Sequence, residues 1–411
     1  MLTVNEMFSE ENFKNFRVYD IEVFKEFQSV TFCNLDGSVD RIFVSSIDGL
    51  DDYEEYLVEG FEVMHSYMSD KILVGFNNWF YDDYILEYIK NPKLAYGASQ
   101  NIINGTRLTK RYEGITFDAM LDLQMGVGLK QIEFNQGKNI LESSVPFDLD
   151  RPLTPEEKLE VIKYNIYDVQ STCDVFKMRL QDIKAHYALV YMVGDKKLQK
   201  RATTYLIGTL LKNNAKKLDS AYYKMERLCI EEGIEMTVPK EVQDEWKAGS
   251  GKSVTITDGN YEYVFGKGGL HACRTDNMYF SDVALPDVTS LYPSIIINLG
   301  LLGNKTDYYE EIYKKRVKLK HEGKKEEQAP LKLILNKTYG ILNYKYSLIN
   351  NPESAFLICY WGQNALYDLG KRLEGVGVKL VQGNTWRSCY NNSRSWTWNN
   401  WRSYERLGKG L

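Results

Sequence analysis

Two acidic residues near the N-terminus have the spacing of a metal-binding pair. Asp20 and Glu22 lie two residues apart in the apolar segment VYDIEVF, which predicts a β-strand. Because alternate side chains of a strand point to one face, both carboxylates should emerge together. Asp52 and Glu54 share this spacing, so the pair gains meaning only from other acids placed to join it.

Three further side chains could join this pair. Asp82 begins an expected helix after the apolar strand KILVGF, and Tyr164 and Asp168 lie four residues apart on one face of a long expected helix. Four carboxylates and a tyrosine can hold two Mg²⁺ ions, with Mn²⁺ as a substitute; such a pair activates a water and stabilises a leaving 3′ oxygen. The pattern therefore predicts a site that cleaves phosphodiesters. Other acids that could approach it are Asp83, Asp118 and Asp122.

A second set lies in the C-terminal half. Asp287 ends an apolar strand in DVTSLYPSI, before a turn and a proline. In LKLILNKTYG, the residues Lys332, Asn336 and Tyr339 fall on one helical face, since four and seven residues are close to whole turns. Phosphoryl transfer needs positioning and charge neutralisation, which an acid and a lysine can provide.

These motifs resemble those of family B DNA polymerases, most closely the compact kind encoded by bacteriophages. DVTSLYPSI matches the family pattern DxxSLYPS, and LKLILNKTYG matches KxxxNxxYG. The family's exonuclease motifs are a DxE strand, an Asn followed four or five residues later by Asp, and a YxxxD helix, and all three occur here. The resemblance covers residues 15 to 385.

The resemblance implies a ribonuclease-H-like 3′→5′ exonuclease domain that uses Mg²⁺ and acts on single-stranded 3′ ends of DNA. The residues that it assigns to catalysis or metal binding are Asp20, Glu22, Asp82, Tyr164 and Asp168. Asn77 or Asn78 would contact the DNA, and the spacing from Asn78 favours Asp82 over its neighbour.

The resemblance also implies a polymerase site for deoxynucleoside triphosphates and primer-template DNA. Asp287 would ligate both catalytic metal ions, the Ser290–Leu291 backbone would face the triphosphate, and Tyr292 would lie under the sugar and exclude a 2′-hydroxyl. These expectations come from the matched motif.

The fingers helix and a glycine-rich loop complete that expected site. Lys332 would contact the triphosphate as a point charge, and Tyr339 would pack against the nascent base pair. Lys337 departs from the family, which usually has a small residue there. Arg316 could contact phosphate, although a solvated charged helix explains it equally well. Other residues of these motifs are Asn336, Gly340 and, in the YxGG-like segment YVFGKGGLH, Gly268 and Gly269.

The expected fold is α/β and α+β with several domains. Residues 1–190 should form the exonuclease domain, with three strands followed by alternating helices. Residues 191–279 are expected to be a connector, and residues 280–385 a partial palm with short helical fingers. The tail, residues 386–411, contains four of the seven tryptophans and no Val, Ile, Met, Phe, Ala or Asp, so it should not pack like the strand before it.

Trp386 stands where the family's third polymerase motif has a second catalytic Asp. Synthesis should therefore be impaired, because metal placement is central to two-metal catalysis. A shifted reading frame, a second chain that supplies the missing palm and thumb, and a deliberate truncation are the alternatives. Three functions remain open: a proofreading DNA polymerase, an exonuclease only, and a non-enzymatic DNA-binding remnant.

Composition narrows the protein's class. Six scattered cysteines without a CxxC, and four histidines without ligand spacing, argue against a zinc site and a disulfide framework. No apolar run reaches 18 residues and no signal-peptide pattern is seen, so a cytoplasmic protein without a membrane partner is expected. The net charge of −5 is weak information about DNA binding, because a positive groove can be local.

Overall fold

The chain separates into two compact units. The computed structural model describes residues 1–50, 55–89, 91–123, 126–276, 280, 283–284, 290–384 and, as backbone, 387–391. The units are Met1–Thr203 and Thr204–Leu411. The finer division into connector, palm and fingers stays a prediction, and Asp287 lies outside the described residues. Within the described part, no helix is long and apolar enough to span a membrane.

A six-stranded mixed sheet forms the centre of the first unit, in the order β4-β3-β2-β1-β5-β6. Strands β1 to β3 pair antiparallel, with Asp36-Gly37 in the predicted turn between β2 and β3. β5 and β6 run parallel to β1, so their carboxyl ends meet at one edge of the sheet. The strands are β1 Phe16–Val23, β2 Gln28–Cys33, β3 Val39–Val44, β4 Val58–Gly60, β5 Ile72–Gly75 and β6 Thr116–Asp118.

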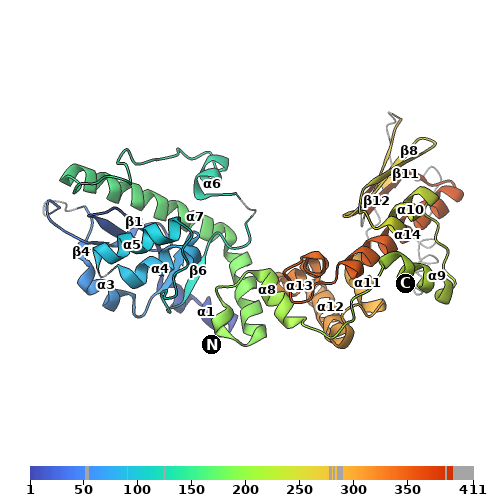
Figure 1. Cartoon of the computed structure of the whole chain (residues 1–411), viewed down its shortest axis with the longest axis horizontal. Helices are drawn as coiled ribbons and strands as arrows, with labels where there is room; N and C mark the ends of the chain where they lie inside the picture. The colour runs from blue at the N-terminus through green and yellow to red at the C-terminus, as the bar shows by residue number, and fades with distance from the viewer. Residues whose placement is uncertain are drawn as a thin grey trace. The chain divides into compact units, whose positions relative to one another are not determined.

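Helices cover both faces of this sheet (Figure 1). Phe16 and Val18 of β1 share a core with α7, whereas Tyr19 and Ile21 share another with α3, α4 and α5. Since side chains alternate along a strand, Asp20 lies on the α7 face of the sheet. The helices of this unit are α1 Val4–Met7, α2 Glu10–Phe13, α3 Phe61–Met68, η1 Asn78–Phe80, α4 Asp82–Tyr88, α5 Pro92–Ile103, α6 Leu129–Asn135, α7 Pro155–Val193 and η2 Lys196–Leu198.

Helix α7 has the predicted start and a later end than expected. Thr154 accepts the backbone N–H of Glu157, and the Glu157 carboxylate accepts the N–H of Thr154, forming a capping box before Pro155. The helix ends where Gly194 adopts a left-handed conformation with φ of 79°. It therefore continues eight residues beyond the expected end near residue 185, to Val193.

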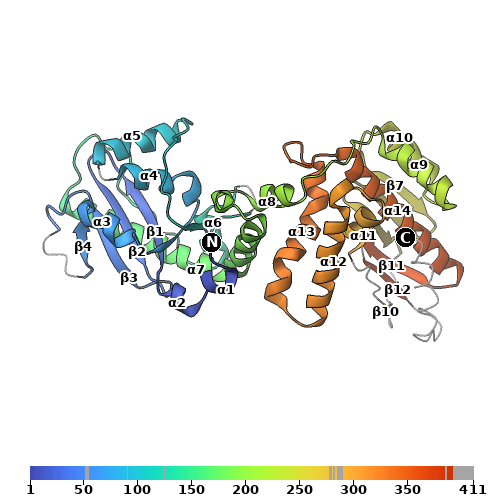
Figure 2. The ribbon, with the colours of Figure 1, turned by 90° about the horizontal axis from the view of Figure 1, so that it is seen from below.

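The second unit contains an antiparallel sheet in the order β10-β12-β11-β9-β8-β7. Helix α14 packs on β9 and β11, and it also contacts α9, α11 and α13; Figure 2 shows it beside the sheet. The strands are β7 Val254–Asp258, β8 Tyr261–Gly266, β9 Gly269–Arg274, β10 Val283–Ala284, β11 Lys379–Asn384 and β12 Arg387–Asn391. The helices are α8 Thr203–Leu210, α9 Ala221–Glu232, α10 Lys240–Ala248, α11 Leu291–Asn298, η3 Gly303–Lys305, α12 Thr306–His321, α13 Lys325–Asn343 and α14 Pro352–Gly375.

Two helix predictions were too long. The helix expected near 51–69 is α3 alone, preceded by β4, with residues 51–54 outside the described part. The helix expected over 196–232 is broken between α8 and α9. There the Asn213 side chain accepts the Ala215 N–H and donates to the Leu211 carbonyl, both at 2.9 Å. Such local side-chain bonds compete with helical ones.

Two segments form strands that the sequence analysis did not predict. Part of the segment expected to be a connector forms the antiparallel meander β7–β9. Glycines lie at its turns, and more buried and more exposed residues alternate along its strands. Residues 387–391 of the tail pair with β11 as β12. Ladder hydrogen bonds use backbone groups, so a segment without aliphatic residues can still join a sheet.

Candidate functional site

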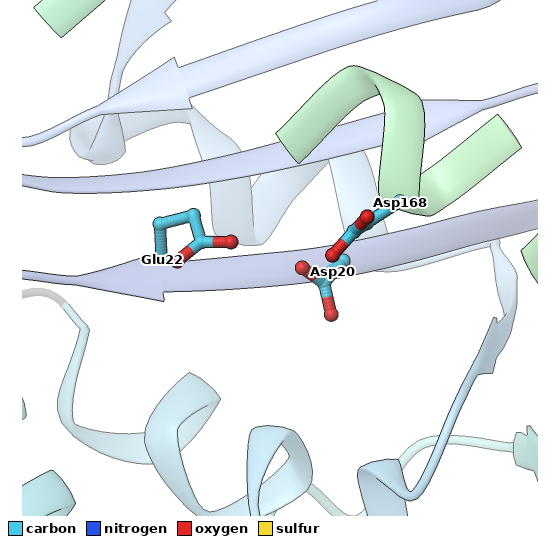
Figure 3. A group of neighbouring side chains, drawn as sticks. All are labelled: Asp20, Glu22 and Asp168. Carbon is cyan, nitrogen blue, oxygen red and sulfur yellow. The ribbon is translucent and has the colours of Figure 1, made fainter. Parts of the chain in front are cut away.

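Three carboxylates meet on the α7 face of the first sheet. Asp20 and Glu22 come from β1 and Asp168 from α7, and one oxygen of each lies within 4.8 Å of the others. Figure 3 shows the three side chains converging between the strand and the helix. The predicted strand pair and helix residue are therefore neighbours, and their spacing suits a cation bound through oxygen.

Asp82 and Asp83 have different environments. Asp82 is buried, and its pKa is raised well above its usual value by this burial and next by the negative charge of Asp20. The Asp83 carboxylate is hydrogen-bonded to groups outside the acid cluster. It accepts hydrogen bonds from Tyr19 (2.8 Å), Asn78 (3.1 Å), Thr116 (2.9 Å) and Lys200 (2.5 Å). These contacts make Asp83 a structural acid and favour Asp82 as the fourth member.

Burial and mutual repulsion disfavour ionisation of the cluster. Burial, followed by the charge of Asp168, raises the pKa of Asp20 to about 7. The pKa of Glu22 is raised strongly by burial and next by Asp20. Burial also raises the pKa of Asp168, against the opposing effect of Lys130. Without a bound cation, full ionisation of these carboxylates therefore costs free energy.

Lys130 of α6 is a member of the site that the sequence analysis missed. Its ammonium group contacts Asp168 at 2.5 Å and Glu133 at 3.7 Å, and it lies 4.8 Å from the centre of the Tyr164 ring. Lys130 is 38 residues from Asp168, and no local pattern links the two. Only the packing of α6 on α7 brings them together.

Buried polar groups surround the acids. The Asn165 amide donates to Asp20 at 2.8 Å, while its own Oδ1 has no partner among the described residues. Thr31 and Ser29 of β2 pair across the ladder with Asp20 and Glu22, and in the described part of the chain neither hydroxyl has a partner. Unpaired buried polar groups are costly, and a hydrated ion can satisfy them. The carboxylate donors and these polar groups fit Mg²⁺.

The other predicted residues of this unit stabilise the chain beside the cluster. Asn77 has a left-handed backbone with φ of 60°, and its N–H donates to Asp118 at 2.8 Å. Asp118 also accepts the Met120 N–H at 2.8 Å, and burial raises its pKa to about 6. Asn78 is fully buried and donates to Asp83. The hydrogen bonds of Asp118 and Asn78 therefore stabilise the turns in which they lie. Tyr164 lies in the cluster, where burial and next the charge of Asp168 raise its pKa.

In the second unit the predicted motifs meet in a cluster of tyrosines and backbone carbonyls. The hydroxyl of Tyr292 donates to the Gly268 carbonyl at 3.1 Å, and that of Tyr339 donates to the Lys267 carbonyl at 2.5 Å. The two rings are 5.0 Å apart, and Cys359 of α14 lies against both hydroxyls. Three segments of the resemblance, distant in sequence, are thus in contact.

Further predicted residues surround this cluster. Ser290 caps α11 in a left-handed conformation with φ of 58°, and its hydroxyl accepts a 3.1 Å hydrogen bond from Arg316. Leu291 is buried against Gly362, and the Gly269 carbonyl accepts from Gln363 at 3.1 Å. The exposed residues on the predicted face of α13 are Lys332, Asn336 and Gly340.

The described histidines and cysteines lie apart from the acid cluster. His186 is buried between Thr203 and the Gln199 carbonyl, and the other three histidines are exposed. Within the described side chains, five cysteines are free thiols and none is in a disulfide. The group of His, Cys, Asp or Glu side chains close enough to share an ion, among those described, is the acidic cluster.

Comparisons with known proteins show a distant structural similarity. No protein-family model and no curated protein matches the sequence. Among solved structures, the chain is similar to the family B DNA polymerase of the hyperthermophilic archaeon Pyrobaculum calidifontis, with 14% identity and a TM-score of 0.47. The match covers 96% of this chain and 55% of that polymerase, so the chain spans about half of its length.

Proposed function

We propose that the first unit is a metal-dependent 3′→5′ exonuclease that acts on single-stranded ends of DNA. The observation that carries this proposal is the convergence of Asp20, Glu22 and Asp168 within 4.8 Å, with Lys130 bonded to Asp168. Buried acids on a strand and a helix are suited to binding metal ions for an in-line displacement at phosphorus. The sheet order, with an antiparallel hairpin beside parallel strands, supports a ribonuclease-H-like domain.

Each residue of the cluster has a distinct task in this proposal. Asp20, Glu22, Asp82 and Asp168 would hold Mg²⁺, which when bound supplies an activated water and charge stabilisation. Lys130 positions the Asp168 carboxylate, and Asn165 holds one oxygen of Asp20. The Tyr164 hydroxyl lies beside Asp168 and can orient a water through a hydrogen bond.

The second unit supports a second candidate, template-directed DNA synthesis from deoxynucleoside triphosphates. The observation that favours it is the contact of Tyr292 and Tyr339 with each other and with the carbonyls of Lys267 and Gly268. That cluster and the exposed Lys332 would bind the nucleotide, and Asp287 would ligate the metal ions. This proposal includes impaired synthesis and a second chain that supplies the missing palm and thumb. It also includes domain boundaries at residues 190, 279 and 385.

A gel assay separates the candidates. A 5′-labelled primer-template is incubated with Mg²⁺, with and without all four deoxynucleotides. We expect the primer to shorten in both cases, and EDTA to stop the shortening. A primer that lengthens would establish synthesis. A chain that binds the DNA but leaves it unchanged would overturn the exonuclease proposal and support the non-enzymatic remnant.

A further inference from the structure

A basic pocket lies in the first unit next to the turn that carries Asp82. Its volume is about 620 Å³. Phe80, the last residue of η1, and Tyr84 of α4 form part of its wall, so the pocket is built on the chain segment that also bears Asp82. The basic residues of the lining are Arg107, Arg111, Lys200 and Arg201.

The pocket carries positive charge that the protein does not fully neutralise. None of its described lining residues is Asp or Glu. Lys200 is paired with Asp83, but among the described residues neither Arg107 nor Arg111 has an ion pair or hydrogen bond. Guanidinium groups form paired hydrogen bonds with phosphate oxygens. The unpaired arginines therefore suit a phosphate ligand.

An aromatic surface accompanies this charge. The Phe80 side chain is 68% exposed and lies in the same pocket as Tyr84. Exposed rings beside arginines are the two components of single-strand nucleic-acid sites: bases stack on the rings and cations contact the backbone.

We infer that this pocket binds a nucleotide unit of the single strand, with a base against Phe80 and phosphates against Arg107 and Arg111. This inference rests on the proposed exonuclease function, because it supplies the path of the strand whose 3′ end is cleaved. Arg107 and Arg111 are two separate guanidinium groups in the lining, so the pocket offers more than one phosphate contact. That arrangement favours a strand over a free nucleotide.

Equilibrium binding of a 5′-fluorescein-labelled dT12 oligonucleotide to the full chain in EDTA tests whether the positive charge of the pocket contributes to binding. Hydrolysis is absent under these conditions, so the result does not depend on nuclease activity. The variant Arg107→Gln with Arg111→Gln is compared with Lys14→Gln plus Lys93→Gln, which removes the same charge at exposed positions outside the pocket. We expect roughly tenfold weaker binding in the pocket variant and a salt slope smaller by about 1.4. Equal affinities for the two variants would overturn the inference.

Photo-crosslinking of an oligonucleotide that contains 5-bromodeoxyuridine tests the aromatic surface. We expect a crosslinked peptide that contains Phe80 or Tyr84, and roughly tenfold weaker binding in Phe80→Ala. Met178→Ala is the control, since that side chain is 64% exposed and outside the pocket. Crosslinks confined to other peptides would contradict the assignment.

Thymidine monophosphate and inorganic phosphate distinguish the sources of the ligand. A strand site is supported if millimolar monophosphate leaves dT12 bound. If the arginine variant loses monophosphate binding but keeps full dT12 binding, the strand assignment is wrong. A chain that shows the expected pocket-dependent binding but no Mg²⁺-dependent hydrolysis would overturn the exonuclease proposal alone.

Discussion

The two candidate sites are held together by opposite kinds of interaction. In the first unit, buried carboxylates repel one another, and Lys130 compensates only part of their charge. In the second unit, the hydroxyls of Tyr292 and Tyr339 donate to backbone carbonyls, so that cluster is neutral and internally satisfied. The difference teaches that the acid cluster needs a cation to be stable when ionised, whereas the contacts of the tyrosine cluster do not involve one.

The sharpest test of this comparison removes the strand pair. Asp20→Ala with Glu22→Ala should lower hydrolysis of a single-stranded 3′ end by roughly a thousandfold or more, since bound metal contributes several kcal/mol to the transition state. DNA affinity in EDTA should change little. The measurement is single-turnover degradation of a labelled oligonucleotide in Mg²⁺.

Asp287→Ala is the matched control, because it removes an acid of the other expected site. It should leave degradation intact. Loss of nuclease activity in this control would show that the two units do not act independently, and degradation that survives the double variant would place the nuclease site elsewhere.

Removing the positioning cation should have the next largest effect. Lys130→Met leaves Asp168 without its ion pair, so we expect about 10- to 100-fold slower hydrolysis and weaker activation by Mg²⁺. The Mg²⁺ dependence of the rate measures this. Lys138→Met, which breaks the ion pair with Asp174 further along α7, should behave as the unmodified chain. If both variants lose equal activity, Lys130 acts through stability alone.

The acid cluster was predictable where its geometry is local. The two-residue spacing places Asp20 and Glu22 on one strand face, and the four-residue spacing places Tyr164 and Asp168 on one helix face. Lys130 could not be found in this way, because its contact depends on how α6 packs on α7.

The choice between two adjacent acids also depended on tertiary structure. Asp83 is set apart from Asp82 by Tyr19, Thr116 and Lys200, which come from three separate segments. The sequence spacing favoured Asp82, which stays a prediction, and it could not show what Asp83 contacts. In the tail, composition misled because β12 pairs through its backbone.

The stability of the chain without divalent metal should depend on pH in a direction set by Asp20. Its pKa is raised from 3.8 to about 7, so the folded state binds the proton more tightly than the unfolded state does. The contribution of Asp20 to the stability of the folded state is fully present below about pH 4, and it is lost as the pH rises through about 7. Each kcal/mol lost should lower the melting temperature by roughly 2–4 °C.

Thermal unfolding in EDTA across this range measures the effect. Asp20→Asn should make the dependence less steep without abolishing it, because the neighbouring acids also have raised pKa values. Mg²⁺ should raise the melting temperature most above pH 7. A variant that keeps the full slope would assign the titration to another group.

The smallest expected effect tests the neutral site. Tyr339→Phe removes the hydroxyl that donates to the Lys267 carbonyl, while the Cys359 thiol still donates to that oxygen at 3.0 Å. We therefore expect a loss of about 1 kcal/mol in the free energy of unfolding of the second unit. Tyr346→Phe, at a 72% exposed position, is the control. Urea unfolding with and without Mg²⁺ provides the measurement. Because this hydrogen bond involves no charged group, Mg²⁺ should not restore the lost stability. Restoration by Mg²⁺ would mean that the tyrosine cluster, like the acid cluster, depends on a cation.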